Sequence, residues 1–551
     1  MKLVHCLALA ASAMLLIPLP ACGAAPERGA KSAVKAAGAV TANRAVTADR
    51  AGRQPAARSP VAPPVASSPV APPAAANQQA AAALAASIRT AVAASGLDPA
   101  KVAVGVSVRD VGSGALVADI GGSTQMVPAS NMKVLTTAAA LRVLGADYAF
   151  ATRLIRAGDR LTVVGDGDPS LGDPDMKDVN TVIDEAGQRR TGLETDAMID
   201  LWLSAAQRAG ITQVKELVVD DRIFDREFQH SGWPRDQLSN SYCAEIAGLN
   251  FNVGLLQATL TVAGGRVALK EWMPSAPWLE LDCRKASPGK GKQPASLARM
   301  DNPVRFAVRG NVKEGETLGV CVHDMPEFFV HYLAERMRKA GIKVASVRVA
   351  DANDPAPAGN PIGGPITSSL AAVVRQCNTE SQNLYAESLL KRIGAKRSGK
   401  SGSWGNGAAA LSEEVDAALG AGTAKTGLTV ADGSGLSRDN EVAPNLLSAW
   451  LRAIALDPKV GPAFIGSLAV AGKSGTVKQR FKDLDPNRAF VPCKTGYING
   501  VSCLSGFVGA PGQMPRFTFS ILCNNLDKDK NGVRDAKALQ EKIVSILAGG
   551  L

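Results

Sequence analysis

The 551-residue sequence is poor in histidine and lacks the spacings that hold metal ions. It has four histidines (His5, His230, His323 and His331) and neither an H-E-x-x-H nor a C-x-x-C sequence. Zinc hydrolases need such ligand sets, and a Ser-His-Asp triad needs a histidine in a recognisable motif. We therefore expect no metal and no other cofactor, and a catalytic serine here would need a lysine as its base.

Aromatic residues and long apolar stretches are also scarce. Aromatics make up 4% of the chain, and beyond the N-terminus no apolar stretch is long enough to span a membrane. The apolar content of 46% and the charged content of 20% are those of a soluble globular protein. The length predicts two or three domains.

The N-terminus has the pattern of an export signal. Lys2 is followed by an apolar run over residues 3–19 and then by small residues. Leu19-Pro20-Ala21-Cys22-Gly23 resembles a bacterial lipoprotein box, in which Cys22 becomes the lipidated N-terminus; plain signal cleavage near Cys22 is the alternative. Residues 1–22 are thus predicted to be a signal peptide. The protein is expected to be periplasmic, with a membrane tether if Cys22 is lipidated.

Residues 23–80 form a low-complexity segment rich in Ala and Pro, in which Ser-Pro-Val-Ala-Pro-Pro occurs twice. Such a composition cannot bury enough apolar surface to fold, so we predict a disordered tether. Its seven Lys/Arg and two Asp/Glu contribute +5 to the net charge of +11. The basic balance therefore predicts no nucleic-acid partner and fits a tether near an anionic membrane or wall.

The first candidate for chemistry is Ser130-Asn131-Met132-Lys133, which opens a helix-like run over residues 134–141. Residues i and i+3 of a helix share a face, so the lysine amine can reach the serine hydroxyl. The unpaired N–H groups of the first turn favour developing negative charge. Two other S-x-x-K sequences, Ser32–Lys35 and Ser287–Lys290, lack a helix start.

Two further motifs follow along the chain. Ser381-Gln382-Asn383 is the only S-x-N sequence and lies at an expected break within a helical region, residues 370–393. Lys-Thr/Ser-Gly occurs four times, beginning at Lys400, Lys425, Lys473 and Lys494. Only Lys494 begins a predicted strand that turns at Asn-Gly and returns, so it is preferred, with Lys473 as the alternative. There Gly496 is expected to let a substrate backbone approach a strand edge.

The distribution of predicted elements indicates an α+β fold. Strands are predicted at 102–109 and 115–120 and again at 493–498, 501–508 and 517–523, with helices at 79–95 and 536–547. One antiparallel sheet flanked by helices would thus be completed by the C-terminal part. We assign residues 81–156 and 366–551 to this catalytic domain. Residues 157–365 are predicted to be an inserted, mainly β region of one or two subdomains, with one helix at 325–340.

The order S-x-x-K, S-x-N, K-T-G resembles the penicillin-recognising acyl-serine transferases. The 251 positions between Ser130 and Ser381 leave room for a large insert. That spacing resembles the low-molecular-mass class C penicillin-binding proteins, the D-alanyl-D-alanine carboxypeptidase/endopeptidase family. The resemblance spans about residues 80–551. It includes further segments: Gly165–Leu171, Phe224, Gly232-Trp233, Asp432–Arg438 and Gly500–Ser502.

The resemblance implies a penicillin-recognising serine transferase fold and a role for each motif residue. Ser130 would be the nucleophile that forms an acyl-enzyme, and Lys133 would take its proton. Ser381 would pass a proton to the leaving amine, and Asn383 would hold the substrate amide.

The K-T-G strand would bind the substrate. Lys494 and Thr495 would hold the terminal carboxylate, Gly496 would allow close approach, and the N–H groups of Ser130 and Tyr497 would form an oxyanion hole. Tyr497 departs from the family pattern, which often has a small residue at that place.

The implied substrates are D-Ala-D-Ala-terminated or cross-linked stem peptides of peptidoglycan, with β-lactams as covalent inhibitors. Carboxypeptidase and endopeptidase activity both stay open. Two alternatives are a serine β-lactamase, and a catalytically inactive cell-wall-binding lipoprotein that keeps the fold.

Overall fold

The computed structural model describes residues 75–551 except residues 185 and 290, and for residues 75–77 it describes only the backbone. The predicted signal peptide, most of the predicted tether and Cys22 lie outside the described residues. Residues 75–551 belong to one compact unit, so the domain boundaries at 157 and 365 stay predictions.

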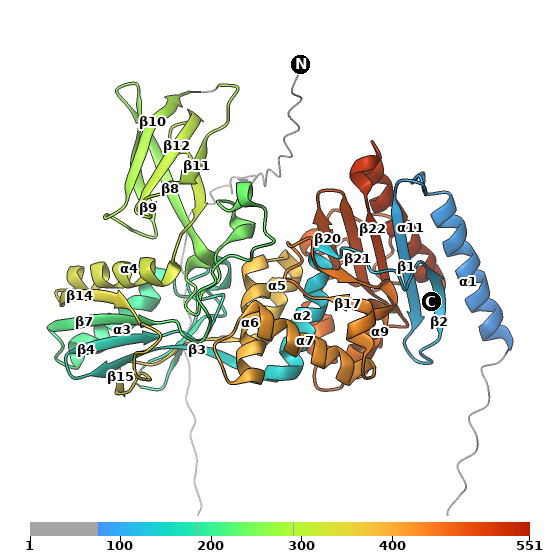
Figure 1. The fold of residues 1–551 in the computed structure, drawn as a ribbon, viewed down its shortest axis with the longest axis horizontal. Coiled ribbons are helices and arrows are strands. Elements are labelled where there is room, and N and C mark those ends of the chain that lie inside the picture. The colour runs from blue at the N-terminus through green and yellow to red at the C-terminus, as the bar shows by residue number, and fades with distance from the viewer. Residues whose placement is uncertain (1–74, 185, 290) are drawn as a thin grey trace, which may run out of the picture. The chain divides into compact units, whose positions relative to one another are not determined.

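A six-stranded antiparallel sheet joins the two ends of the described chain (Figure 1). Its order is β19-β20-β21-β22-β1-β2, and β1 pairs with β22 along its whole length. The predicted strands appear within one residue of their expected ends. The bounds are β1 Ala103–Asp110, β2 Leu116–Ile120, β19 Ala469–Val470, β20 Pro492–Ile498, β21 Val501–Val508 and β22 Phe517–Asn524.

Both faces of this sheet are covered, because successive side chains of a strand point to opposite faces. On β21, Leu504 packs into a core with Ile543 of α11. Its neighbour Cys503 belongs to the larger core of the helical part. The helices are α1 Ala75–Ala93, α2 Met132–Leu144, α5 Leu370–Glu380, α6 Asn383–Ser398, α7 Trp404–Leu419, α8 Thr423–Gly427, α9 Pro444–Leu456, α10 Gly461–Ser467 and α11 Gly532–Gly549.

Between α2 and α5 the chain builds a second, eight-stranded sheet with its own core. The order is β14-β7-β4-β3-β16-β5-β6, and β15 also pairs with β3. Its strands are β3 Ala149–Ala157, β4 Arg160–Val164, β5 Thr181–Ile183, β6 Arg189–Arg190, β7 Gln213–Asp220, β14 Lys343–Val349, β15 Asn360–Pro361 and β16 Ile366–Ser369.

Two helices, not one, belong to this region. The predicted helix appears as α4 (Met325–Lys339), but α3 (Thr195–Arg208) was not expected. Its buried residues, among them Met198, Trp202 and Ala206, recur at helical spacing and pack into the core of the second sheet. The prediction of a single helix was wrong because the neighbouring Gly- and Pro-rich strands dominated the sequence pattern.

Two three-stranded sheets complete the insert. One has the order β13-β8-β9 and the other β10-β12-β11, in which β10 and β12 run parallel. Their bounds are β8 Leu255–Ala263, β9 Arg266–Met273, β10 Glu280–Pro288, β11 Ser296–Arg299, β12 Arg305–Val312 and β13 Thr317–Cys321. A short ladder in the catalytic part pairs β17 (Leu428–Thr429) with β18 (Glu441–Val442).

Three features concern the described part of the chain alone. None of its helices is long and apolar enough to cross a membrane. It holds no group of three or more His, Cys, Asp or Glu residues placed to bind a metal ion. Its seven cysteines are all free thiols, at positions 243, 283, 321, 377, 493, 503 and 523.

Candidate active site

Ser130 lies in a one-turn 3-10 helix, Ala129–Asn131, immediately before α2. The turn is tight, since Ala129 adopts a left-handed φ of 46°. Gly435 packs closely on this turn: a Cβ on Gly435 would lie 1.8 Å from the Ala129 carbonyl oxygen. The half-buried hydroxyl of Ser130 is thus held at the start of the helix, where N–H groups face developing negative charge.

Lys133 is fully buried and donates to three oxygens. Its Nζ lies 3.0 Å from Ser130 Oγ, 2.6 Å from Asn383 Oδ1 and 3.0 Å from the Ser434 carbonyl oxygen. Burial lowers the pKa of Lys133 to about 8, against the nearby Cys377, Glu387 and Asp432, which act to raise it. A substantial fraction of this lysine is therefore neutral at mildly alkaline pH.

The three partners of Lys133 are chemically unequal. A neutral amine has two N–H donors and one lone pair. The Asn383 and Ser434 oxygens are carbonyls that can only accept, so the lone pair is left to face the Ser130 hydroxyl. Deprotonated Lys133 is therefore placed to accept the proton of Ser130.

Ser381 lies at the break between α5 and α6, in the left-handed region with a φ of 63°. Its Oγ accepts a hydrogen bond from Lys494 Nζ at 2.8 Å. Two residues later Asn383 begins α6 and binds on both sides. Its Oδ1 accepts from Lys133, and its Nδ2 donates to the Tyr242 carbonyl oxygen of the insert at 2.8 Å.

Lys494 on β20 is the second fully buried lysine of the site. Besides Ser381 it donates to the Thr495 carbonyl oxygen at 2.9 Å. Burial, and then the positive charge of Lys133, lower the pKa of Lys494 to about 7. The alternative lysine, Lys473, is exposed, although Thr476 beyond it lies 2.8 Å (Oγ1 to Oγ1) from Thr495.

The Lys494 side of β20 offers a free strand edge. β19 pairs only with Pro492 and Cys493, so within the described residues the outer edge of β20 from Lys494 onward has no strand partner. Gly496 was expected to let substrate backbone approach, but in the structure it allows the close approach of the turn that precedes α2. A Cβ there would lie 2.6 Å from the Pro128 carbonyl oxygen and 2.7 Å from Asn131 Nδ2. Gly496 thus seats β20 against the turn that carries Ser130.

The structure brings together the eight residues singled out in the sequence. Four of them, Ser130, Lys133, Ser381 and Asn383, lie at the start of α2 and at the break before α6, and the other four are residues 494–497 of the adjoining strand β20. Tyr497 is the outermost of them: its side chain is 55% exposed, with Lys537 Nζ 5.6 Å from the ring centre. The site thus consists of a serine at a helix start, two buried lysines and a strand edge that has no strand partner among the described residues.

Comparison with known proteins agrees with this geometry. Residues 88–548 match the model of the D-Ala-D-Ala carboxypeptidase 3 (S13) family. The chain belongs to this family. A D-alanyl-D-alanine carboxypeptidase of Actinomadura sp. (strain R39) is 30% identical over 429 residues, which are 73% of this chain and 73% of that protein.

Two further comparisons involve Haemophilus influenzae. Its D-alanyl-D-alanine carboxypeptidase DacB is 23% identical over 422 residues, 71% of this chain and 79% of that protein. The crystal structure of penicillin binding protein 4 (dacB) from this organism superposes with a TM-score of 0.63 at 21% identity. It covers 81% of this chain and 97% of its own, and confirms the predicted fold class.

The sequence analysis did not identify Glu387, which stabilises the backbone next to this site. It lies one helical turn after Asn383 on α6 and is fully buried. Its carboxylate accepts from the Gly433 and Ser434 N–H groups at 2.8 Å each and from Trp404 Nε1 at 2.9 Å. It therefore fixes the backbone of Gly433 and Ser434, and with it the Ser434 carbonyl that accepts from Lys133. A charged residue at i+4 of Asn383, amid apolar neighbours, was the available signal.

Asp432 organises the adjoining loop, residues 432–438. Its buried carboxylate accepts from the N–H groups of Gly435 at 2.7 Å and Ser437 at 2.6 Å. It also accepts from Trp233 Nε1, in the insert, at 3.0 Å. The sequence resemblance included these residues without giving them a role; the structure shows that they shape the loop that packs on Ala129.

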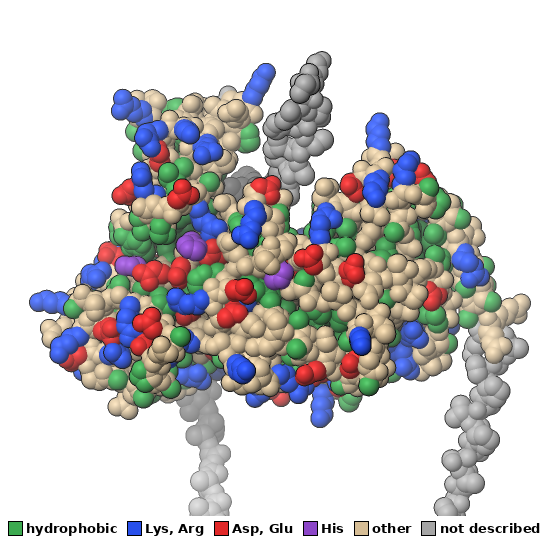
Figure 2. Space-filling view, in the orientation of Figure 1, with side chains coloured by type: hydrophobic (Ala, Val, Ile, Leu, Met, Phe, Trp, Pro, Cys, Tyr) green, Lys and Arg blue, Asp and Glu red, His purple; other side chains and the backbone are tan. Residues whose placement is uncertain are grey.

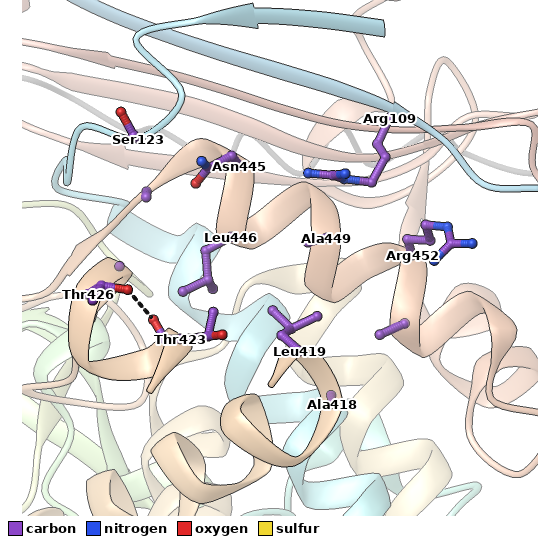
Figure 3. A pocket seen from close by; sticks show the side chains of 13 residues that line it. Arg109, Ser123, Ala418, Leu419, Thr423, Thr426, Asn445, Leu446, Ala449 and Arg452 are labelled. Carbon is purple, nitrogen blue, oxygen red and sulfur yellow. Dashed lines mark hydrogen bonds between the residues drawn. The ribbon is translucent and has the colours of Figure 1, made fainter. Parts of the chain in front are cut away.

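A separate cavity of about 540 Å³ lies beside α9 and is lined by none of the eight site residues (Figure 3). Two arginines line it, and both bind carbonyl oxygens of the β1–β2 turn. Arg109 donates to Gly114 at 3.0 Å, and Arg452 donates to Val111 at 2.8 Å. The Arg452 contact holds the turn on α9, and the Arg109 contact, made from β1 itself, closes the β1–β2 hairpin.

Proposed function

We propose that this S13 family member is a serine D-Ala-D-Ala carboxypeptidase, a D,D-endopeptidase, or both, and that it acts on peptidoglycan stem peptides. The observation that carries this proposal is the buried Lys133 amine. Among its hydrogen-bond partners in the described part of the chain, only Ser130 can donate a proton to it when it is neutral. The activities named for its relatives agree with this chemistry.

In the first step, Ser130 Oγ attacks the carbonyl carbon of the D-Ala–D-Ala bond while its proton moves to Lys133 Nζ. The tetrahedral adduct then collapses, and the C–N bond breaks. Ser381, hydrogen-bonded to Lys494, relays to the leaving amine the proton that Lys133 took, so Lys133 becomes neutral again. The product is an ester on Ser130. Water then attacks this ester while Lys133 takes a proton from the water, and Lys133 returns that proton to Ser130 Oγ as the ester C–O bond breaks.

The remaining motif residues bind the substrate. Lys494 and Thr495 hold the free carboxylate of a terminal D-Ala by charge-assisted hydrogen bonds. The backbone N–H groups of Ser130 and Tyr497 receive the oxyanion, since Gly496 keeps β20 close to the Ser130 turn. Asn383 aligns the substrate amide while its Oδ1 holds Lys133.

β-Lactams fit the same site because their strained amide mimics the D-Ala–D-Ala bond. We therefore propose that penicillin acylates Ser130 and leaves a slowly hydrolysed ester. A β-lactam complex of the Haemophilus influenzae protein, with a TM-score of 0.61 and 21% identity, shows that the shared fold accommodates such a compound.

Mass spectrometry tests the assignment. After incubation with penicillin, the intact protein should gain one adduct, and peptide mapping should place it on Ser130; Ser130→Ala should gain none. Incubation with muropeptides should release free D-Ala, cleaved cross-linked dimers, or both. An adduct on Ser130→Ala would refute the nucleophile, and rapid turnover of a chromogenic cephalosporin would favour a β-lactamase. Neither adduct nor product would favour an inactive wall-binding protein.

We further propose that the protein is exported to the periplasm and tethered through a lipid on Cys22. The support is the lipobox-like sequence ending in Cys22 and the basic low-complexity segment after it. Fatty-acid labelling of the wild type but not of Cys22→Ser, with release of that variant from membranes, is the expected result. Equal labelling of both would contradict the tether.

A further inference from the structure

Positive charge is concentrated in a short part of the insert. Residues 283–313 contain eight Lys/Arg and one acidic residue, Asp301, so this segment carries +7. The whole chain carries +11, of which residues 23–80 supply +5. The rest of the chain is therefore slightly acidic, and the excess in the insert is local. Figure 2 shows Lys and Arg side chains gathered over the lobe that Figure 1 labels β10, β11 and β12.

The lobe is a sheet with one buried and one exposed face. On β12, Phe306, Val308 and Val312 are buried, whereas Arg309 is exposed on the opposite face. Lys285 on β10 is also exposed. The positive groups therefore lie on the face that is turned away from the core of the insert.

Lys285 and Arg309 are direct partners in the parallel register of β10 and β12. Like charges on directly opposed strand positions destabilise a sheet. Farther along the same two strands, Glu280 and Arg305 also stand opposite each other and form an ion pair at 3.0 Å. The chain thus neutralises one end of this face and leaves the other end positive.

The side chains of four basic residues form no ion pair with a carboxylate among the described residues: Lys285, Lys292, Arg309 and Lys313. Glu316 accepts a hydrogen bond from the backbone N–H of Lys313 at 2.7 Å and not from its side chain. All four are exposed. The other described basic residues of the segment are paired, Arg284 with Asp282, Arg299 with Glu245 and Arg305 with Glu280. We call the four unpaired residues the basic face.

We propose that the basic face binds the peptidoglycan polymer outside the active site, through the carboxylates of its stem peptides. This inference rests on the proposed function for the identity of the polymer. Several exposed cations without ion-pair partners on one lobe match a chain with repeated anionic groups, because several weak contacts add up along its length. The basic face would thus keep the enzyme on its substrate between cleavage events.

A polymer fits the basic face better than a membrane does. Interfacial membrane binding combines basic residues with large apolar side chains that enter the lipid. Between residues 283 and 313 the only exposed large apolar side chain is Val304, at 37%. The face is thus suited to surface electrostatics without insertion.

The test compares two fourfold variants of the full chain, both in a Ser130→Ala background so that no substrate is turned over. One replaces Lys285, Lys292, Arg309 and Lys313 by Gln. The matched control replaces four exposed lysines of the catalytic part by Gln, namely Lys396, Lys459, Lys530 and Lys542. Both variants lose the same charge. Binding is measured by co-sedimentation with purified sacculi, with sacculi whose carboxylates are capped as amides, and with phosphatidylglycerol vesicles.

We expect the basic-face variant to bind untreated sacculi about tenfold more weakly than the parent at physiological ionic strength, and the control less than about twofold more weakly. The difference should vanish on capped sacculi and at about 1 M salt, where the screening length is about 3 Å. Equal binding by the two variants would overturn the proposal. So would a dependence on these four residues seen with vesicles and not with sacculi.

The same substitutions made with Ser130 intact separate this proposal from the proposed function. Release of D-Ala from a short soluble peptide should be unchanged in the basic-face variant, because the peptide is too short to reach it. If even the wild type releases none, the proposed function fails while the binding result still stands. A loss of soluble-peptide activity confined to the basic-face variant would instead assign these residues to the active site.

Discussion

Lys133 and Lys494 lie in the protein interior and donate hydrogen bonds to defined oxygen atoms, whereas Lys285 and Arg309 lie exposed and form no ion pair with a carboxylate among the described residues. Burial removes water from an ammonium group and lowers its pKa, so that it can exchange protons near neutral pH. Exposure keeps a cation charged and lets its field act over about 8 Å at physiological salt. We propose that the same kind of charge serves proton transfer and carboxylate binding in one place and attachment in the other.

The largest expected effect comes from removing the buried base. Lys133→Ala should lower the rate constant for penicillin acylation by about 10³-fold, within the range of general-base contributions. Stopped-flow labelling with a fluorescent penicillin measures it. A matched control is Lys391→Met, which removes another buried lysine that pairs with Asp225. This control should lose thermal stability and keep acylation within about tenfold; equal losses in both variants would remove Lys133 from the mechanism.

The pH profile is the next test of the buried lysines. Acylation needs neutral Lys133, with a pKa of about 8, so the rate should rise with pH up to that value. Carboxylate binding needs protonated Lys494, with a pKa of about 7, so binding should weaken above it. We expect kcat/KM for a D-Ala-D-Ala peptide to be bell-shaped with a maximum between them, the two values belonging to the coupled pair. Lys494→Gln should remove the alkaline limb, and an unchanged limb would contradict its role.

Glu387 should have a smaller but diagnostic effect as a positioning residue. In Glu387→Gln the new NH₂ group must face N–H donors, so the Ser434 peptide shifts and acylation falls by about 10- to 100-fold. Burial, and then the charge of Asp432, raise the pKa of Glu387 to about 7, so it is mainly ionised only above that pH. There, loss of its negative charge should also move the rising limb of the pH profile to lower pH, because Glu387 raises the pKa of Lys133.

The control for Glu387 is Glu414→Gln, a buried carboxylate on α7 that pairs with Arg142. It should reduce stability and leave the midpoint of the profile in place. A purely structural role for Glu387 would give the same result as this control.

The smallest effect concerns the basic face. Arg309→Gln removes the like-charge partner of Lys285, a repulsion on the order of 0.2–1 kcal/mol. The melting temperature should therefore rise, by about 1 °C, while turnover of a soluble peptide stays constant. Differential scanning calorimetry measures the shift. The control is Lys396→Gln, at an exposed lysine on α6, which should not raise the melting temperature. A lower melting temperature for Arg309→Gln would mean that other contacts of Arg309 outweigh its repulsion from Lys285.

Much of this structure could be predicted from the amino-acid sequence. The strands of the main sheet follow alternating or apolar runs with Gly, Pro and Asn-Gly at their ends, so β21 appeared at its expected bounds. Ser130 and Lys133 were found by their spacing, and Lys494 by the hairpin after it. These are local signals, since each rests on residues that are neighbours along the chain.

What could not be predicted depends on contacts between distant residues. Glu387 acts through the backbone of Gly433 and Ser434, 46 and 47 positions away. The packing role of Gly496 depends on the carbonyl of Pro128, which no pattern places beside it. The register that sets Lys285 against Arg309 likewise exists only once two parallel strands have paired.

The contact between Asn383 and the Tyr242 carbonyl has a consequence for how this enzyme can be divided. The segment 225–242 of the insert also supplies Asp225 to the buried Lys391 and Trp233 to the buried Asp432. A chain trimmed to the two catalytic segments would leave an amide, an ammonium and a carboxylate each short of a partner. The insert therefore completes the hydrogen bonding of buried groups in the catalytic part, which is not a module that can be transplanted without it.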